Sequence, residues 1–230
     1  MTTLTARFAR IHTPADDAAG IPRGGPQVKQ ATTTQPINPL LAARWSPRAF
    51  DGSSLSEAAV QSLLEAARWA PSAMNHQPWR FIIGRNHDGD TDRAFKNIYD
   101  ALAEGNQIWA GDAPLLIAAT VRTQEEDGTA RTVGGFELGL ATAQIIVQAH
   151  DLGLHAHVIG GFNGDQVRAT FDIPDDYQPL AVVAVGRVGT PDSLPERLAA
   201  AERAPRTRLP LADIAYGEAW GEPAQVTEQI

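Results

Sequence analysis

The segment from residue 44 to residue 48 gathers charged and polar donors in the order Arg44-Trp45-Ser46-Pro47-Arg48. Each arginine keeps its charge at any working pH, and its planar guanidinium matches the oxygen geometry of a phosphate. The hydroxyl of Ser46 adds a neutral donor. These residue types predict an anion-binding segment, although a solvated basic loop fits this stretch equally well when it is taken alone.

A second segment, residues 70–81 (APSAMNHQPWRF), combines small residues with amide side chains. Small side chains allow a planar ligand to approach the backbone. The amides of Asn75 and Gln77 offer paired donors and acceptors, which suit the edge of a heterocycle. A proline-rich turn is the alternative, but the dense mixture of residue types favours a loop that contacts a ligand.

Arg206 and Arg208 lie near the C-terminus, and two arginines at this spacing indicate little by themselves. They are about 160 residues from Arg44 and Arg48, so only folding can bring the four together. In a chain of net charge −8, four arginines in one place would form an anion site.

The predicted strand over residues 155–159 carries two further features. Gly160-Gly161 follows it directly, which permits close backbone approach to a ligand but is also compatible with a plain turn. His155 and His157 alternate along one face of the strand. A third metal ligand is not evident and the chain has no cysteine, so these histidines are interpreted as structural or surface residues.

These motifs fall at the ends of predicted helices and strands. Hydrophobic periodicity predicts helices over residues 54–70, 93–103, 134–152, 165–171 and 194–202, and strands over residues 79–83, 114–121, 155–159 and 180–185. Ser54-Leu55-Ser56-Glu57 has the spacing of a capping box at the start of the first helix, and Gly153 is a plausible stop for the third. The alternation of strands and helices predicts an α/β or α+β fold.

The helix over residues 134–152 is apolar on nearly all sides. In a domain of this size, that pattern predicts burial on most sides and a subunit interface over part of the helix. The polar stretch over residues 122–132, with its acidic run Glu125-Glu126-Asp127, is predicted to be a solvated loop.

Composition limits the function classes. The net charge of −8 argues against general nucleic-acid or membrane-surface binding, and the lack of cysteine excludes disulfides, thiolate metal sites and cysteine nucleophiles. No apolar run approaches the roughly 20 residues of a membrane span, and we expect a cytoplasmic protein. Residues 1–38 are rich in proline, glycine and threonine and are predicted to be a flexible or partner-wrapping arm ahead of one domain over residues 39–230.

Taken together, RWSPRAF, the helix after it and APSAMNHQPWRF resemble the signature of the FMN-dependent nitroreductase family. Later elements agree in order: Gly105-Asn106 before the strand APLLIAA, the long central helix, Gly-Gly-Phe at 160–162, and Arg206-Thr207-Arg208-Leu209-Pro210. The similarity runs from about Pro39 to Trp220 and leaves the N-terminal arm outside.

The resemblance implies an α+β, intertwined homodimer with a mixed sheet flanked by helices and two FMN sites at the subunit interface. It also implies an FMN-dependent NAD(P)H oxidoreductase that reduces nitroaromatics, quinones or activated alkenes. NAD(P)H would be a transient co-substrate that reduces FMN and leaves. A small-molecule electron acceptor would then enter the same cleft, in a ping-pong cycle of two-electron steps.

The family's functional residues map onto this sequence one by one. The FMN-binding set implied by the resemblance is Arg44, Trp45, Ser46, Arg48, Pro71, Ser72, Ala73, Asn75, Asn106, Gly160, Gly161, Arg206 and Arg208. Within it, the arginines would hold the phosphate end, Asn106 would bond the flavin ring, and the two glycines would offer backbone donors near flavin N5. Many members carry an acidic residue where this chain has Gly160, which puts any side-chain role there in doubt.

The loop over residues 71–75 has its own implied place. Pro71, Ser72 and Ala73 would pack on the flavin of the other subunit, and Met74 and Asn75 would lie near the substrate. His76 belongs to the same loop and is a candidate for facing the substrate. The resemblance implies no catalytic side chain, because the chemistry takes place on flavin N5.

Two other functions are compatible with the same motifs. One is a specialised enzyme on the same scaffold: a dehydrogenase, a dehalogenase or a flavin-cleaving enzyme. The other is a non-catalytic flavin-binding protein. Extra residues capping the flavin would favour the specialised enzyme, and the stretch over residues 122–132 is too short to indicate such a lid.

Overall fold

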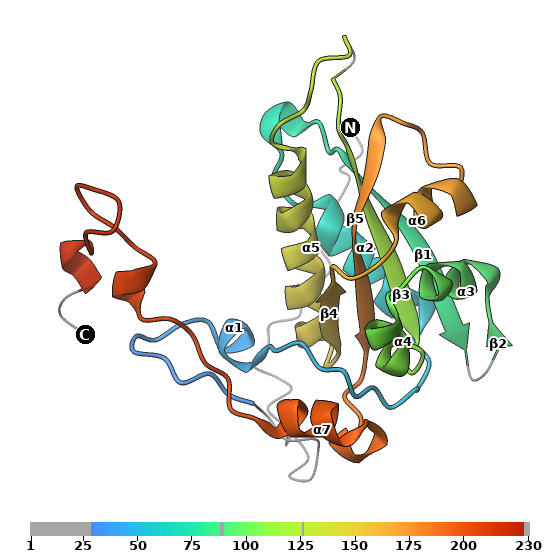
Figure 1. The fold of residues 1–230 in the computed structure, drawn as a ribbon, viewed down its shortest axis with the longest axis horizontal. Coiled ribbons are helices and arrows are strands. Elements are labelled where there is room, and N and C mark those ends of the chain that lie inside the picture. The colour runs from blue at the N-terminus through green and yellow to red at the C-terminus, as the bar shows by residue number, and fades with distance from the viewer. Residues whose placement is uncertain (1–28, 88–89, 126, 228–230) are drawn as a thin grey trace, which may run out of the picture.

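A computed structural model describes residues 29–87, 90–125 and 127–227 (Figure 1). A five-stranded sheet has the order β2-β1-β3-β5-β4. The strands are β1 (Trp79–His87), β2 (Asp90–Thr91), β3 (Leu115–Arg122), β4 (His155–Ile159) and β5 (Tyr177–Gly186). All four strand pairings between these residues are antiparallel, which differs from the mixed sheet that the resemblance implied. The reason is visible between β1 and β3: Leu115 lies opposite Arg85, so the chain enters β3 beside the end of β1 and returns instead of crossing over.

Helices cover both faces of the sheet, which gives an α+β arrangement in three layers (Figure 1). The helices are α1 (Pro39–Ala43), α2 (Glu57–Arg68), α3 (Arg93–Asp100), α4 (Glu104–Ala110), α5 (Gly134–Asp151), α6 (Gly164–Thr170) and α7 (Glu196–Arg203). Helices α2 and α5 pack on one face, and α3, α4 and α6 pack on the other. None of the helices within the described residues is long and apolar enough to span a membrane.

Strand β3 shows why its sequence is a continuous apolar run. Leu115 and Ile117 join the core under α2 and α5, while Leu116 and Ala118 join the core under α3 and α6. A strand buried on both faces needs apolar residues at successive positions, not at alternate ones. The hydrophobic stretch predicted as a buried strand is therefore the centre of the sheet.

Several element boundaries differ from the sequence predictions. The expected capping box does not form, because α2 begins later: Ser56 is the N-cap, its hydroxyl accepts from the Ala59 amide at 3.2 Å, and Glu57 is the first helical residue. Helix α3 ends at Asp100, and β1 continues to His87 through its pairing with β3 and β2. Helices α1 and α4 were not expected, since elements of five to seven residues depend on tertiary contacts more than on local pattern. Gly153, at φ +70°, follows α5 as predicted.

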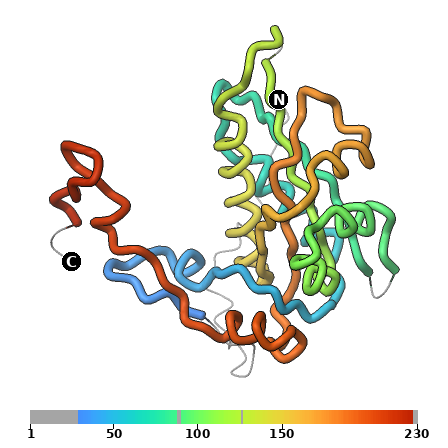
Figure 2. The backbone as a smooth tube through the Cα atoms, in the orientation of Figure 1, coloured from blue at the N-terminus to red at the C-terminus, as the bar shows by residue number. Residues whose placement is uncertain are grey.

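The two ends of the described chain lie side by side and project from the body together (Figure 2). The Arg206 guanidinium donates to the carbonyl oxygens of Lys29 at 2.8 Å and Ala42 at 2.7 Å. The Ala31 amide donates to the Ala42 carbonyl at 2.9 Å. The part of the predicted arm that the structure describes, residues 29–38, thus lies along α1 and the C-terminal segment, and residues 1–28 lie outside the described residues.

Candidate functional site

Three of the four predicted anion-binding arginines line one pocket of about 710 Å³, which we call the arginine pocket. Arg44 reaches it from the end of α1, and Arg206 and Arg208 reach it from the segment after α7. The other lining residues are 31–35, Ile37, Leu41, Thr207 and 209–211. No aspartate or glutamate is among the described residues that line this pocket, so its positive charge is not balanced from within.

The guanidinium groups in the arginine pocket act on one another. Burial lowers the pKa of Arg44, and the neighbouring charges of Arg206 and Arg208 lower it further. Burial and the charge of Arg208 likewise lower the pKa of Arg206. Its two hydrogen bonds to backbone carbonyls hold Arg206 in place despite this repulsion. An anion bound among the three groups would relieve the repulsion and gain charge-assisted hydrogen bonds.

Arg48 is placed differently from the other three arginines. Its side chain is not among those that line the arginine pocket. Its backbone amide donates to the carboxylate of Glu202 on α7, which also accepts from the Ala49 amide at 2.8 Å. Glu202 is buried, and these two hydrogen bonds fix the backbone that follows Ser46. No sequence motif indicates this role for Glu202.

Trp45 is packed in the interior and does not line the arginine pocket. Its ring meets His155 edge-on at 5.9 Å, and the Lys29 ammonium lies 4.7 Å from its centre. Burial lowers the pKa of His155 to about 4, with His150 and Arg44 contributing through their charges. His155 therefore stays neutral beneath the arginines, in agreement with a structural histidine.

Gly160 and Gly161 line a second hollow at the end of β4, and Asn106 of α4 contacts Gly161. The Asn106 side-chain amide donates to the Gly161 carbonyl at 2.9 Å. A Cβ on Gly161 would lie 2.8 Å from that same amide nitrogen, so a larger residue there would require the Asn106 side chain to move, whereas a Cβ on Gly160 would meet open space. Among the described residues, the Gly161 N–H has no hydrogen-bond partner and remains available as a donor.

Strand β4 connects this hollow to the segment that carries the first arginines. The Nδ1 of His157 donates to the Pro47 carbonyl at 2.8 Å, and three residues further along β4 the chain reaches Gly160. At about 3.3 Å per residue, that step covers roughly 10 Å. The chain therefore holds cationic groups that suit a phosphate and backbone or amide groups that suit a ring edge, and this donor set fits a phosphorylated planar cofactor.

The loop over residues 71–77 lies elsewhere, beside the start of α5. Its Ala73 amide donates to Glu137 of α5 at 2.7 Å. No hydrogen bond between described residues joins this loop to Asn106 or to the two glycines. Met74 is 90% exposed, and Asn75 is exposed beside it. Within the described part of one chain, Arg44, Arg206 and Arg208 come together, and Asn106 separately meets Gly161. The 71–75 loop lines neither place.

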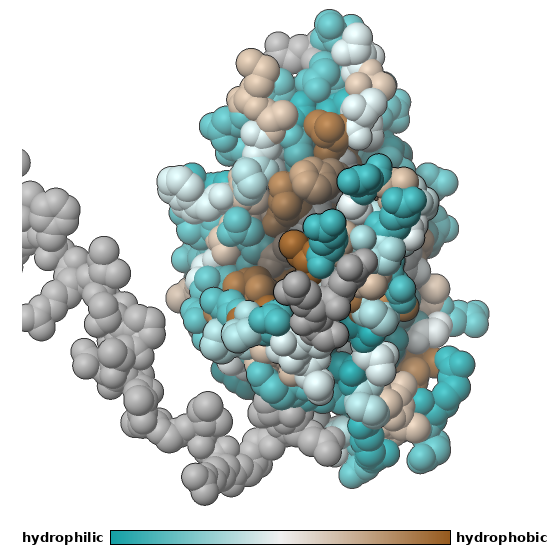
Figure 3. Space-filling model, turned by 90° about the vertical axis from the view of Figure 1, so that its left-hand side faces the viewer, coloured by the Kyte–Doolittle hydropathy of each residue, from teal (hydrophilic) through white to brown (hydrophobic). Residues whose placement is uncertain are grey.

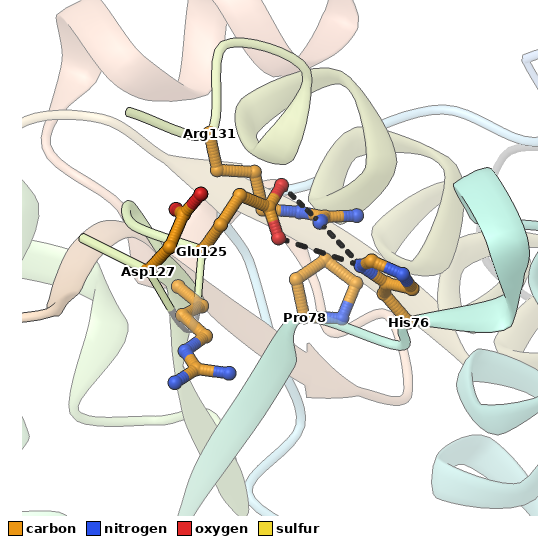
Figure 4. Close-up of a pocket in the computed structure, with 6 residues that line it drawn as sticks. His76, Pro78, Glu125, Asp127 and Arg131 are labelled. Atoms are coloured by element: carbon orange, nitrogen blue, oxygen red, sulfur yellow. Dashed lines mark hydrogen bonds and ion pairs between the residues drawn. The ribbon is translucent and has the colours of Figure 1, made fainter. Parts of the chain in front are cut away.

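A cavity of about 500 Å³ opens beside this loop (Figure 4). The residues lining it are His76, Pro78, Arg122, Glu125, Asp127 and Arg131. Arg131 is bound on both sides, to Glu137 at 2.8 Å and to Glu125 at 2.7 Å, and its other contact is His76 Nδ1 at 2.8 Å. Burial lowers the pKa of Arg131, but hydrogen bonds and charge from Glu137 and then Glu125 outweigh it, and the net pKa is raised.

This arrangement differs from the prediction, which places Glu125 in a solvated loop and gives no role to Arg131 or Glu137. A usable signal was present, because Glu137 is the one acidic residue before Asp151 in a helix that is otherwise almost wholly apolar. A carboxylate in that position needs a cationic partner, and Arg131 stands six residues earlier. No group of three or more metal-binding side chains occurs within the described part of the chain.

Comparisons with known proteins agree with the arrangement of these elements. The model of the family described as "Nitroreductase family" matches residues 41–107 and 87–187, a region that includes both sequence motifs and the paired glycines but not Arg206 or Arg208. A crystal structure described as an oxidoreductase containing FMN is 37% identical, with a TM-score of 0.78, and the match covers 85% of this chain and 98% of that one.

Two curated relatives match in sequence. A 15.4 kDa protein from the ask 5′ region of Mycolicibacterium smegmatis is 36% identical over 149 residues, which are 63% of this chain and 99% of that protein. A candidate NADH dehydrogenase/NAD(P)H nitroreductase of Methanothermobacter thermautotrophicus is 27% identical over 153 residues, 64% of this chain and 74% of the relative.

Proposed function

The chain belongs to the nitroreductase family, as its motifs predicted, and from this membership we propose that it is an FMN-dependent NAD(P)H oxidoreductase. Its substrates would be small electron acceptors: nitroaromatics, quinones or activated alkenes. NAD(P)H and the acceptor would use the same cleft in turn, so each half of the cycle would transfer two electrons. When bound, FMN would supply this redox chemistry, and the protein would supply binding and orientation.

The arginine pocket is the observation that carries the proposal. Arg44, Arg206 and Arg208 converge without a carboxylate among the residues lining the pocket, and the charges of Arg206 and Arg208 lower the pKa of Arg44. A phosphate of about two negative charges would offset most of their combined charge of three. Arg48 would contribute through the backbone that Glu202 holds, and Ser46 would add a hydroxyl donor.

At the other end of the proposed site, the chain's own residues would orient the ring. The Gly161 N–H would donate to the ring edge near N5, and the remaining hydrogen-bonding capacity of the Asn106 amide would face the heterocycle. The open space beside Gly160 would leave room for a ring or a substrate. No side-chain acid or base is needed at this end.

The proposal requires a homodimer. Within one chain, the 71–75 loop is separate from the arginines and from the glycines, so a second copy would bring its Pro71, Ser72 and Ala73 onto the cofactor. Met74 and Asn75 of that copy would then face the acceptor.

Exposed apolar surface supports the pairing. The face of the molecule seen in Figure 3 gathers hydrophobic side chains within a hydrophilic rim. Phe136 on α5 is 72% exposed, and Trp220 on the projecting C-terminal segment is 93% exposed. Large apolar residues left in water at this level are typical of surfaces that a partner covers.

A spectrum and a transient-kinetic experiment test the proposal. The purified protein should be yellow and should release FMN, not FAD, on denaturation. Stopped-flow mixing with NADH and with NADPH should bleach the flavin, and a panel of quinones, nitroaromatics and alkenes should restore its colour. A protein that remains flavin-free after incubation with FMN would contradict the proposal, and flavin that no nicotinamide reduces would indicate a binding protein instead.

A further inference from the structure

The loop over residues 73–77 holds an unusual backbone. Met74, Asn75 and Gln77 have φ values of 49°, 58° and 48°, in the left-handed region that non-glycine residues rarely adopt. Three such residues within four positions need surrounding contacts that hold them there, and backbone strain of this kind is concentrated at functional sites. The loop itself supplies part of this support: the Ser72 hydroxyl accepts from the Gln77 amide at 3.0 Å.

The rest of the support comes from buried charges on and before α5. Glu137 accepts from the Ala73 amide at 2.7 Å, which fixes the start of the loop. Arg131 binds both oxygens of Glu137. It also reaches His76 Nδ1 at 2.8 Å, which fixes the other end of the loop (Figure 4). The side chains of Arg131 and Glu137 are only 3% and 4% exposed. A buried ion pair contributes little net stability compared with apolar packing, so its contacts with the loop suggest a positioning role.

We propose that Arg131 and Glu137 are positioning residues, which hold the 73–77 loop in its strained conformation so that Met74 and Asn75 can contact the electron acceptor. The second half of this statement rests on the proposed function. Glu125 contributes by accepting a hydrogen bond from the Arg131 guanidinium at 2.7 Å. This bond couples the 122–132 stretch to the loop. This stretch, predicted to be no more than a solvated loop, would then help to shape the acceptor site of the partner.

The contacts of His76 give the direction of its hydrogen bond. An arginine N–H can only donate, so His76 Nδ1 accepts from Arg131. Glu125 lies 3.5 Å from the same nitrogen, and Asp127 and Arg122 line the same cavity. His76 is thus a hydrogen-bond acceptor that ties the loop to Arg131.

The test compares two arginines that line one cavity. Arg131→Lys keeps the charge but loses the two-pronged contact with Glu137. Arg122→Lys is the matched control, because the Arg122 side chain binds Asp176 at 3.2 Å and, between described residues, makes no hydrogen bond to residues 73–77. Amide hydrogen exchange of the full-length protein should be about tenfold faster over residues 73–77 in Arg131→Lys, the ratio expected from loss of one charge-assisted hydrogen bond. In Arg122→Lys, exchange over these residues should remain unchanged.

Steady-state kinetics with a quinone acceptor provide the functional measurement. Arg131→Lys should raise the acceptor KM about tenfold, while kcat stays within about twofold and FMN affinity within about threefold. Glu125→Gln removes a partly exposed contact and leaves no buried charge unpaired, so it should shift exchange and KM in the same direction by about threefold even if Arg131→Lys fails to fold.

The outcomes separate the two proposals. Unchanged exchange over residues 73–77 in both Arg131→Lys and Glu125→Gln would overturn the positioning role, whether or not the protein binds flavin. Faster exchange with an unchanged acceptor KM would show that the loop is held for another reason, and would also overturn it. A wild-type protein that never binds FMN contradicts the proposed function instead, and it is recognised before any variant is made.

Discussion

The arginine pocket and the surroundings of Arg131 shift the pKa of arginine in opposite directions. In the pocket, three guanidinium groups face one another with no carboxylate among the lining residues, and the pKa values of Arg44 and Arg206 are lowered. Beside the loop, Arg131 is held between Glu137 and Glu125, and its pKa is raised. Burial lowers the pKa of Arg44 and of Arg131 alike, so burial alone does not explain why one pKa is lowered and the other is raised. The balance of charge around each arginine does.

The largest expected effect is on folding stability. Arg131→Ala would leave the Glu137 carboxylate buried and unpaired, and removing one partner of a buried ion pair costs about 3–5 kcal/mol. The free energy of unfolding, measured by urea titration of the flavin-free protein, should fall by that amount. Arg208→Ala should change it little, since Arg208 is exposed and, among the described residues, its side chain donates only to the carbonyl of its neighbour, Thr207. Equal losses of unfolding free energy in Arg131→Ala and Arg208→Ala would contradict the distinction between an arginine paired with buried carboxylates and an exposed arginine of the pocket.

The next effect is on ligand affinity. Arg206→Ala with Arg208→Ala should weaken FMN binding by about a hundredfold, because each charge-assisted hydrogen bond contributes roughly 1.5–3 kcal/mol and both act on one anion, so their effects are not additive. Isothermal titration with FMN and with riboflavin measures this, and riboflavin, which has no phosphate, should bind poorly and be nearly unaffected. Unchanged FMN affinity in the double variant would remove the C-terminal pair from the site.

A smaller effect depends on pH. His155 has its pKa lowered to about 4 by burial and by the charges of His150 and Arg44, whereas an unfolded histidine titrates near 6.5. Its contribution is fully present above pH 6.5 and is lost as the pH falls from 6.5 to about 4, since the unfolded chain takes up the proton first. The loss is at most roughly 3 kcal/mol.

His155→Phe keeps a ring against Trp45 and removes this titration. Urea unfolding at pH 7 and at pH 4.5 should therefore show a smaller loss of stability in this variant than in the wild type. Inorganic phosphate in the arginine pocket would offset the repulsion from Arg44 and reduce the wild-type loss. Identical pH dependence in the wild type and His155→Phe would rule out His155 as the source.

The smallest effect concerns Arg122, which lines the same cavity as Arg131 but pairs with the partly exposed Asp176. Arg122→Ala should lower the free energy of unfolding by less than about 1 kcal/mol, because partly exposed ion pairs contribute little. The same urea titration measures it. A loss of unfolding free energy as large as that of Arg131→Ala would mean that any arginine lining this cavity is equally important for stability, whatever charges surround it.

Much of the fold could be predicted from local sequence. The apolar run of β3, the alternation of helices and strands and the stop at Gly153 follow from hydrophobic pattern and backbone chemistry, which act within a few residues. The start of α2 could not be predicted as well, because Ser54 and Ser56 are both acceptable caps by residue type and only the course of the preceding chain selects Ser56. Helix α1 depends on contacts with α5 and with the C-terminal segment.

The candidate site divides in the same way. By itself, the sequence determined the family and the residue types suited to a phosphate and a ring, since each follows from chemistry within a short motif, whereas the contact of Gly161 with Asn106, 55 residues earlier, is seen only in the structure. Only the tertiary structure decided that Arg206 joins Arg44 while Arg48 is held through its backbone by Glu202. Only the tertiary structure likewise shows that Glu137 and Arg131 form hydrogen bonds with Ala73 and His76 of the loop. Burial and electrostatic balance depend on segments distant along the chain, and no local pattern encodes which of them will meet.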